Sequence, residues 1–181
     1  MALLGAIALS FYAIHASYHV FHGKPENSLW ACHLGAAIVG VGFLISSPTT
    51  SGIGTLFLAM GTPLWLLDLA AGAEFFPTSC LTHVGGLVIG LYGATRLGVP
   101  RGVWWKALIT LAVLIGLSRL LTPASANVNV AFAVQRGCES FFHSHATFLA
   151  IIMFLAGGFF FIIEHALRRW LAPSDARIEG P

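Results

Sequence analysis

Residues 29–46, LWACHLGAAIVGVGFLIS, form an apolar run without a charged side chain. A run of about this length and polarity is typical of a helix that crosses a lipid bilayer. Near its amino end it carries a thiol and an imidazole in adjacent positions, Cys32 and His33. The stretch therefore predicts a membrane helix that presents reactive groups close to one membrane surface.

The composition of the whole chain agrees with this prediction. Of its 181 residues 57% are hydrophobic and only 9% are charged, and the mean hydropathy is +0.84. Soluble domains carry about 25% charged residues, so we expect an integral membrane protein without a soluble catalytic domain. A net charge of +2 is too small to indicate nucleic acid. Membrane lipid is the expected partner, and other membrane proteins are the second class considered.

Five further apolar runs flank the first one, separated by short stretches rich in polar residues, proline and glycine. We expect an all-α, multi-pass bundle of six transmembrane helices over residues 1–170, followed by a polar tail over residues 171–181. The amino-terminal run, residues 1–21, lacks a basic region and a small-residue cleavage site, so we interpret it as a retained span. The expected spans are residues 1–21, 29–46, 53–73, 80–97, 104–121 and 141–167.

The positions of Lys and Arg predict the orientation, because cytoplasmic loops carry an excess of both. With the amino terminus inside, most of the nine Lys and Arg residues lie on the inner side, and both termini are predicted to be cytoplasmic. The inner residues are Arg96, Arg101, Lys106, Arg168, Arg169 and Arg177, and the outer ones are Lys24, Arg119 and Arg136.

Six alternating spans would bring most of the ionisable residues in the apolar runs to one membrane surface. Because a charged group at a helix centre costs about 2.5–3.5 kcal/mol on insertion scales, such residues gathered at one depth indicate a site. These residues are His15, His19, His22, Cys32, His33, Asp68, His83, His143 and His145.

Small residues follow two of these groups at helical spacing. Ala36 and Gly40 lie four and eight positions after Cys32, and Gly86 and Gly90 lie three and seven positions after His83. Stripes of small residues let membrane helices approach closely, so both stripes predict helix–helix contacts with the polar groups facing inward.

Cys32 and His83 are the candidate catalytic pair. A thiolate is a nucleophile, and a neighbouring imidazole can take the thiol proton. Attack of Cys32 on an ester carbonyl would give a thioester that water or a lipid hydroxyl resolves, with no cofactor. This predicts a lipid acyltransferase or lipid ester hydrolase, whereas Cys32 could instead be a small packing residue. The supporting groups would be Asp68 to orient His83, and Asn127, Asn129 and His33 as oxyanion or substrate ligands.

The order of the motifs resembles the YwaF-like integral membrane family, a group of six-helix proteins. The motifs are Cys32-His33 between apolar residues, a third span with glycine and proline, Ser79-x-x-x-His83, and Asn129-Val130-Ala131-Phe132. The resemblance implies kinship with eukaryotic Cys–His phospholipid acyltransferases and, more distantly, with androgen-induced fatty acid ester hydrolases. It implies Cys32 as the nucleophile and His83 as its partner.

A histidine-ligated metal or haem site is the competing interpretation. His15, His19 and His22 are spaced i, i+4 and i+7, so one helix face would present three imidazoles. Imidazole suits Zn, Cu, Fe and Ni, and histidines from different helices can also ligate haem. The residues that could complete the coordination shell are His33, His143 and His145.

A third interpretation is a non-catalytic subunit of a membrane complex, with histidines used for contacts or pigment binding. The cysteines add a separate hypothesis. If the outer side is oxidising, Cys80 and Cys138 could form a disulfide between loops and leave Cys32 as the odd thiol.

Overall fold

The computed structural model describes residues 1–170, so the predicted polar tail lies outside the described residues. The described part is helical with connecting loops and contains no strand, which confirms the all-α prediction. The helices are α1 (Ala2–Phe21), α2 (Ala31–Leu44), α3 (Pro48–Ala70), α4 (Pro77–Cys80), a π-helical turn (Leu81–Gly85), α5 (Gly86–Leu97), α6 (Val103–Leu121) and α7 (His145–Trp170). Short 3-10 turns occur at Pro25–Leu29, Ala124–Ala126, Val128–Val130 and Glu139–Phe141.

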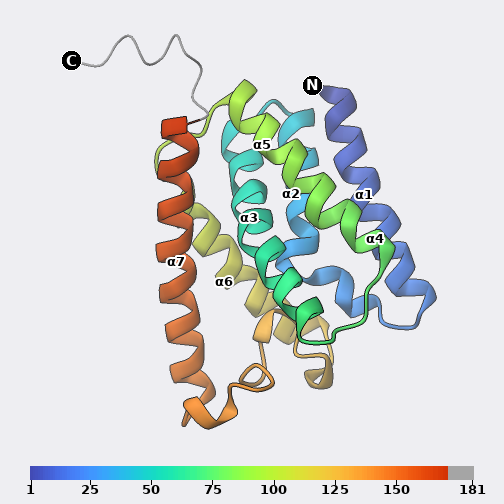
Figure 1. The fold of residues 1–181 in the computed structure, drawn as a ribbon, viewed down its shortest axis with the longest axis vertical. Coiled ribbons are helices and arrows are strands. Elements are labelled where there is room, and N and C mark those ends of the chain that lie inside the picture. The colour runs from blue at the N-terminus through green and yellow to red at the C-terminus, as the bar shows by residue number, and fades with distance from the viewer. Residues whose placement is uncertain (171–181) are drawn as a thin grey trace.

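The long helices alternate in direction along the chain, so the amino terminus and the end of α7 lie at the same end of the bundle (Figure 1). Helix α2 packs between α1 and α3, and α3 also contacts α5, α6 and α7. Helix α4, the π-helical turn and α5 continue one another as a single interrupted rod. Because α1 and α2 run in opposite directions, the end of α1 lies beside the start of α2.

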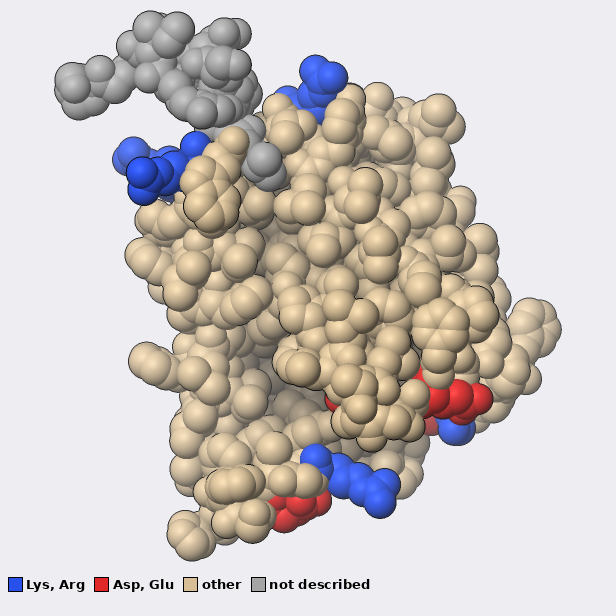
Figure 2. All heavy atoms as spheres, in the orientation of Figure 1, with Lys and Arg blue, Asp and Glu red and all other residues tan. Residues whose placement is uncertain are grey.

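Four helices, α1, α3, α6 and α7, are long and apolar enough to cross a membrane. Helix α2 has only 14 residues, which gives about 21 Å at 1.5 Å per residue, less than the roughly 30 Å of a hydrocarbon core. The fourth expected span is divided by the π-helical turn. Figure 2 shows that on this face the charged side chains lie toward the two ends and leave an uncharged middle. The structure therefore supports a multi-pass membrane protein.

Two helix starts differ from the sequence-based boundaries because of capping residues. Helix α3 begins at Pro48 rather than residue 53, since the Ser47 hydroxyl accepts the Thr50 N–H at 3.2 Å and proline suits the first helical position. Helix α7 begins at His145 rather than residue 141, and the Ser144 hydroxyl accepts the Thr147 N–H at 3.1 Å.

The predicted stripes of small residues do form helix contacts. A Cβ built on Gly40 would lie 2.8 Å from the carbonyl oxygen of Gly5 in α1, and one on Gly86 would lie 3.0 Å from the Cβ of Ala36. A Cβ on Gly61 in α3 would overlap the Cβ of Cys32. The start of α2 is therefore held directly against α3, which fixes the position of the residues that follow Cys32.

Glu164, near the carboxyl end of α7, binds the backbone at the start of α6, a contact that no sequence pattern predicts. Its side chain is buried, and its carboxylate accepts the backbone N–H groups of Gly102 at 3.0 Å and Trp104 at 2.8 Å. These N–H groups belong to the first turn of α6 and have no partner within the helix. Glu164 therefore caps α6 from a neighbouring helix.

Candidate metal centre

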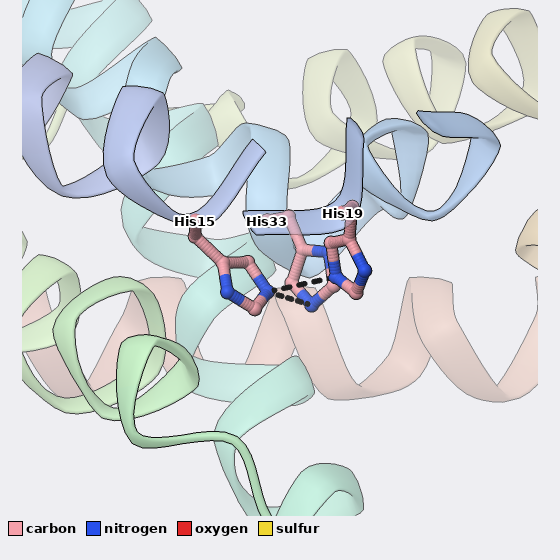
Figure 3. Close-up of side chains that lie close together, drawn as sticks. All are labelled: His15, His19 and His33. Atoms are coloured by element: carbon pink, nitrogen blue, oxygen red, sulfur yellow. Dashed lines mark hydrogen bonds between the residues drawn. The ribbon is translucent and has the colours of Figure 1, made fainter. Parts of the chain in front are cut away.

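Three histidine side chains meet at the end of the bundle where α1 finishes and α2 begins. His15 and His19 are one helical turn apart on α1, so their rings lie on the same face, and both are buried. His33 belongs to the first turn of α2, which packs antiparallel to α1. Figure 3 shows that the three rings point toward one another across this helix pair.

The ring nitrogens of this group, which we call the histidine triad, lie at distances suited to a metal ion. Nε2 of His15 is 3.2 Å from Nε2 of His33 and 3.2 Å from Nε2 of His19. All three donor atoms lie within 4.8 Å of one another. A tetrahedral ion with nitrogen ligands at about 2.0–2.1 Å needs donor atoms about 3.3–3.4 Å apart. The two separations measured from His15 are close to this requirement.

Hydrogen bonds among the three rings cannot account for both close nitrogen–nitrogen contacts of the triad. Nδ1 of His33 lies 2.8 Å from the carbonyl oxygen of Asn27, which can only accept, so we assign the ring proton to Nδ1 and a lone pair to Nε2. A neutral His15 carries at most one proton on Nε2, and that proton can be directed at only one of its two neighbours. One close nitrogen–nitrogen contact is therefore left without a well-aligned hydrogen bond. A cation at the centre would accept all three lone pairs.

Two groups outside the triad orient its rings. Thr78 Oγ1 lies 2.9 Å from Nδ1 of His15, and the Asn27 carbonyl holds His33 as described above. A hydrogen bond to one ring nitrogen of a histidine fixes which of its two nitrogens can face a metal. Sequence reasoning missed both: Thr78 lies 63 residues from His15 along the chain, and the Asn27 contact uses a backbone carbonyl.

A cavity of about 170 Å³ adjoins the triad. Its lining includes the triad rings together with Trp30, Trp65 and two carboxylates, Asp68 and Glu74. Both carboxylates are exposed, so the cavity reaches the molecular surface. A cation bound by the triad would therefore be accessible from one end of the bundle, past negatively charged groups that favour its approach.

Cys32 and His83 lie next to the triad. The Cys32 sulfur, a ring nitrogen of His33 and a ring nitrogen of His83 are within 4.8 Å of one another. His83 lies in the π-helical turn, its ring stacks on Trp65 at 4.8 Å, and the Thr62 hydroxyl donates to its carbonyl oxygen at 3.2 Å. Its Nδ1 is buried and has no hydrogen-bond partner in residues 1–170. Helix irregularities of this type are frequent at functional sites.

Asp68 does not take the place expected for it beside His83. It is exposed on the last turns of α3, and within the described chain no hydrogen bond joins it to His83. The structure therefore gives no support to Asp68 as the third member of the expected Cys32–His83–Asp68 triad, because the end of α3 places Asp68 in the lining of the cavity.

The two asparagines expected to stabilise an oxyanion serve other groups. Asn127 accepts the N–H groups of Phe132 and Ala133 within its own loop. Asn129 accepts the N–H of Ala31 at 2.8 Å and donates to the Leu29 carbonyl and the Ser118 hydroxyl, both at 2.9 Å. The Asn127 amide donates to the Ala133 carbonyl at 3.1 Å, so both amides are engaged within the protein and the structure gives no support to their expected role beside Cys32. Asn129 instead caps α2.

Three histidines of the predicted metal set lie away from the triad. His22 ends α1 with φ −93° and ψ 12°, outside the helical register, and its exposed ring stacks on Tyr18 at 4.0 Å. His143 is exposed in a loop. His145 opens α7, and its Nε2 donates to the Val130 carbonyl at 2.9 Å. The metal hypothesis was therefore wrong for these three positions.

The proposed Cys80–Cys138 disulfide is not formed. Cys32, Cys80 and Cys138 are all free thiols.

Comparison with known proteins gave no match to a protein-family model, a curated protein or a solved structure.

Proposed function

We propose that the chain is a six-span membrane protein with both termini in the cytoplasm. Four spans follow from helix length and apolarity. Helix α2 and the interrupted rod from Pro77 to Leu97 would supply the other two, because both run antiparallel between long apolar helices. The inner-side excess of Lys and Arg described above supports the orientation. Cysteine-accessibility labelling at the two ends of the bundle in intact cells would test it, and termini on opposite sides would refute it.

We propose that this protein binds a first-row transition metal ion through His15, His19 and His33. The observation that carries the proposal is the convergence of three Nε2 atoms, with two separations of 3.2 Å, in a buried position between α1 and α2. Imidazole nitrogens favour Zn, Cu, Fe and Ni. The neutral imidazoles would donate lone pairs to the ion, and the nearby negative charge comes from Asp68 and Glu74 in the lining of the adjoining cavity.

The geometry favours a single ion over haem. Two axial histidines of a haem lie on opposite faces of the macrocycle, which requires their nitrogens to be roughly 4 Å apart with the ring between them. Nε2 of His15 lies only 3.2 Å from each of its neighbours. These nitrogens are too close for a haem plane to separate them, whereas they fit ligands that share one ion.

The number of ligands indicates an accessible centre. Structural zinc sites are closed by four protein ligands, whereas catalytic sites use three and leave one position for water or substrate. The triad supplies three imidazoles, and the adjoining cavity of about 170 Å³ supplies space for an exogenous ligand. A small molecule that enters past Asp68 could therefore reach the ion directly.

Metal titration of the purified protein tests this proposal. We expect one tightly bound Co²⁺ or Zn²⁺ per chain after treatment with a chelator and reconstitution in detergent. His15→Ala and His33→Ala should each weaken binding at least about tenfold. His22→Ala is the matched control, because His22 directly follows the same helix but its ring stacks on Tyr18. Wild-type protein that retains no metal, or equal loss in His22→Ala, would refute the proposal.

Thiol-based lipid acyl transfer is the second candidate, in line with the YwaF-like resemblance. One observation favours it: the Cys32 sulfur and a ring nitrogen of His83 lie within 4.8 Å. The positions of Asp68, Asn127 and Asn129 give it no support. A lipid-like acyl probe that labels the wild-type protein but not Cys32→Ala would favour this candidate, and absence of labelling would count against it.

A further inference from the structure

A second group of metal-binding side chains lies beside the triad and shares one member with it. This group consists of Cys32, His33 and His83, which we call the thiol station, and its donor atoms lie within 4.8 Å of one another. Cys32 and His33 come from the first turn of α2, and His83 comes from the π-helical turn. The two groups therefore meet at His33.

His83 gives an independent indication of a ligand at this station. Its side chain is 1% exposed, and Nδ1 has no hydrogen-bond partner in the part of the chain described. A buried imidazole nitrogen without a partner is unfavourable because it has lost its hydration. The ring cannot easily turn away, since Trp65 stacks on it with an interplanar angle of 2°. A cation bound by this nitrogen would supply the missing partner.

The shared histidine limits the two groups to one ion at a time. Nδ1 of His33 is engaged with the Asn27 carbonyl at 2.8 Å, so only Nε2 remains as a ligand. Nε2 already lies 3.2 Å from Nε2 of His15, in the triad. A terminal imidazole nitrogen has one lone pair, so it can serve the triad or the thiol station but not both.

We propose that a single cation exchanges between the histidine triad and the thiol station, with Nε2 of His33 as the common ligand. This inference rests on the proposed function, because His33 belongs to the triad. Binding at the thiol station forms a metal–sulfur bond and breaks the S–H bond of Cys32, and the proton is released to water. When the ion returns to the triad, the metal–sulfur bond breaks and the Cys32 sulfur takes a proton back from water. The metal keeps its oxidation state. Thiolate with imidazole selects Zn²⁺ or Cu⁺, so the ligand class is a thiophilic transition-metal ion.

Co²⁺ substitution tests the exchange, because cobalt reports its ligands in its absorption spectrum. We expect wild-type protein to bind one Co²⁺ and to show both ligand-field bands and a near-ultraviolet thiolate-to-cobalt charge-transfer band. Cys32→Ser and His83→Gln should lose the charge-transfer band but keep one Co²⁺ in the triad. His15→Ala should bind Co²⁺ more weakly but, at saturating Co²⁺, should keep the charge-transfer band, because the ion is then held at the thiol station. His22→Ala should match the wild type.

Each alternative result has a definite meaning. Ligand-field bands that depend on His15, without a charge-transfer band, would overturn the exchange and leave the triad site standing. Two Co²⁺ per chain would overturn the shared ligand. Protein that binds no Co²⁺ would overturn both proposals. Acylation of Cys32 that requires His83, without a charge-transfer band, would assign the pair to acyl transfer. Because His83→Gln could fail to fold, Cys32→Ser provides the same spectral test without altering the π-helical turn.

Discussion

Replacing Asn129 by alanine should loosen the start of α2, which carries both Cys32 and His33. Asn129 is 6% exposed, accepts the Ala31 N–H at 2.8 Å and donates to the Leu29 carbonyl at 2.9 Å. It thereby joins the loop after α6 to the first turn of α2. Alanine at this position removes the acceptor and both amide donors and leaves buried polar groups unpaired.

The expected loss of stability follows from these contacts. A helix N-cap is worth about 1 kcal/mol, and each of the two donated hydrogen bonds is worth about 0.5–1.5 kcal/mol. Together they give about 2–4 kcal/mol. For a chain of this length, 1 kcal/mol corresponds to about 2–4 °C in Tm. Asn129→Ala should therefore lower the apparent Tm by roughly 5–15 °C.

Asn127→Ala is the matched control for the backbone contribution. Both asparagines adopt left-handed backbone conformations, with φ 55° at Asn129 and φ 43° at Asn127, so alanine has a similar conformational cost at each. Asn127, however, is half-buried and bonds only within its own loop, where water can replace more of the lost contacts than at the buried Asn129. The difference between the two variants isolates the cap on α2.

Thermal unfolding in detergent, followed by tryptophan fluorescence at one scan rate, measures the effect. Co²⁺ titration of the same samples should show weaker binding in Asn129→Ala than in Asn127→Ala, because His33 lies in the turn that is loosened. If Asn129→Ala lowers the apparent Tm no more than Asn127→Ala does, the cap does not hold α2 and the reasoning is refuted.

Three further predictions follow from the packing and from the triad. Gly61→Ala places a methyl group against Cys32, so it should destabilise the protein by about 1–3 kcal/mol in detergent unfolding. Gly116→Ala, where a Cβ meets no atom within 4 Å, is its control, and equal effects would contradict the packing argument. Glu164→Ala should cost about 1–2 kcal/mol by removing the cap on α6, and Glu164→Gln, which keeps one acceptor oxygen, should cost less; the reverse order in Tm would exclude this role. Lowering the pH from about 7.5 to 5.5 should weaken Co²⁺ binding, because protons compete for imidazole lone pairs, and titrations with unchanged affinity would argue against histidine ligands.

The helical character of the chain and much of its packing could be predicted from the residues alone. Apolar runs far longer than a strand, ended by proline, glycine and serine, predict membrane helices, because these signals are local to each helix. The small residues after Cys32 and His83 also predict close helix contacts, because their spacing alone sets the helix face that they occupy. The gathering of histidines at one end also followed from the alternation of the spans.

Which of these histidines meet depends on how the helices pack, and no local pattern predicts it. His22 has the right spacing to join His15, but α1 ends before it, and its ring turns toward Tyr18. The third ligand is His33, from a different helix. Likewise, Asn129 caps Ala31 from 98 residues away. Such contacts depend on how each helix is rotated and where it ends against its neighbours, and these quantities are set by packing between distant segments rather than by any local pattern.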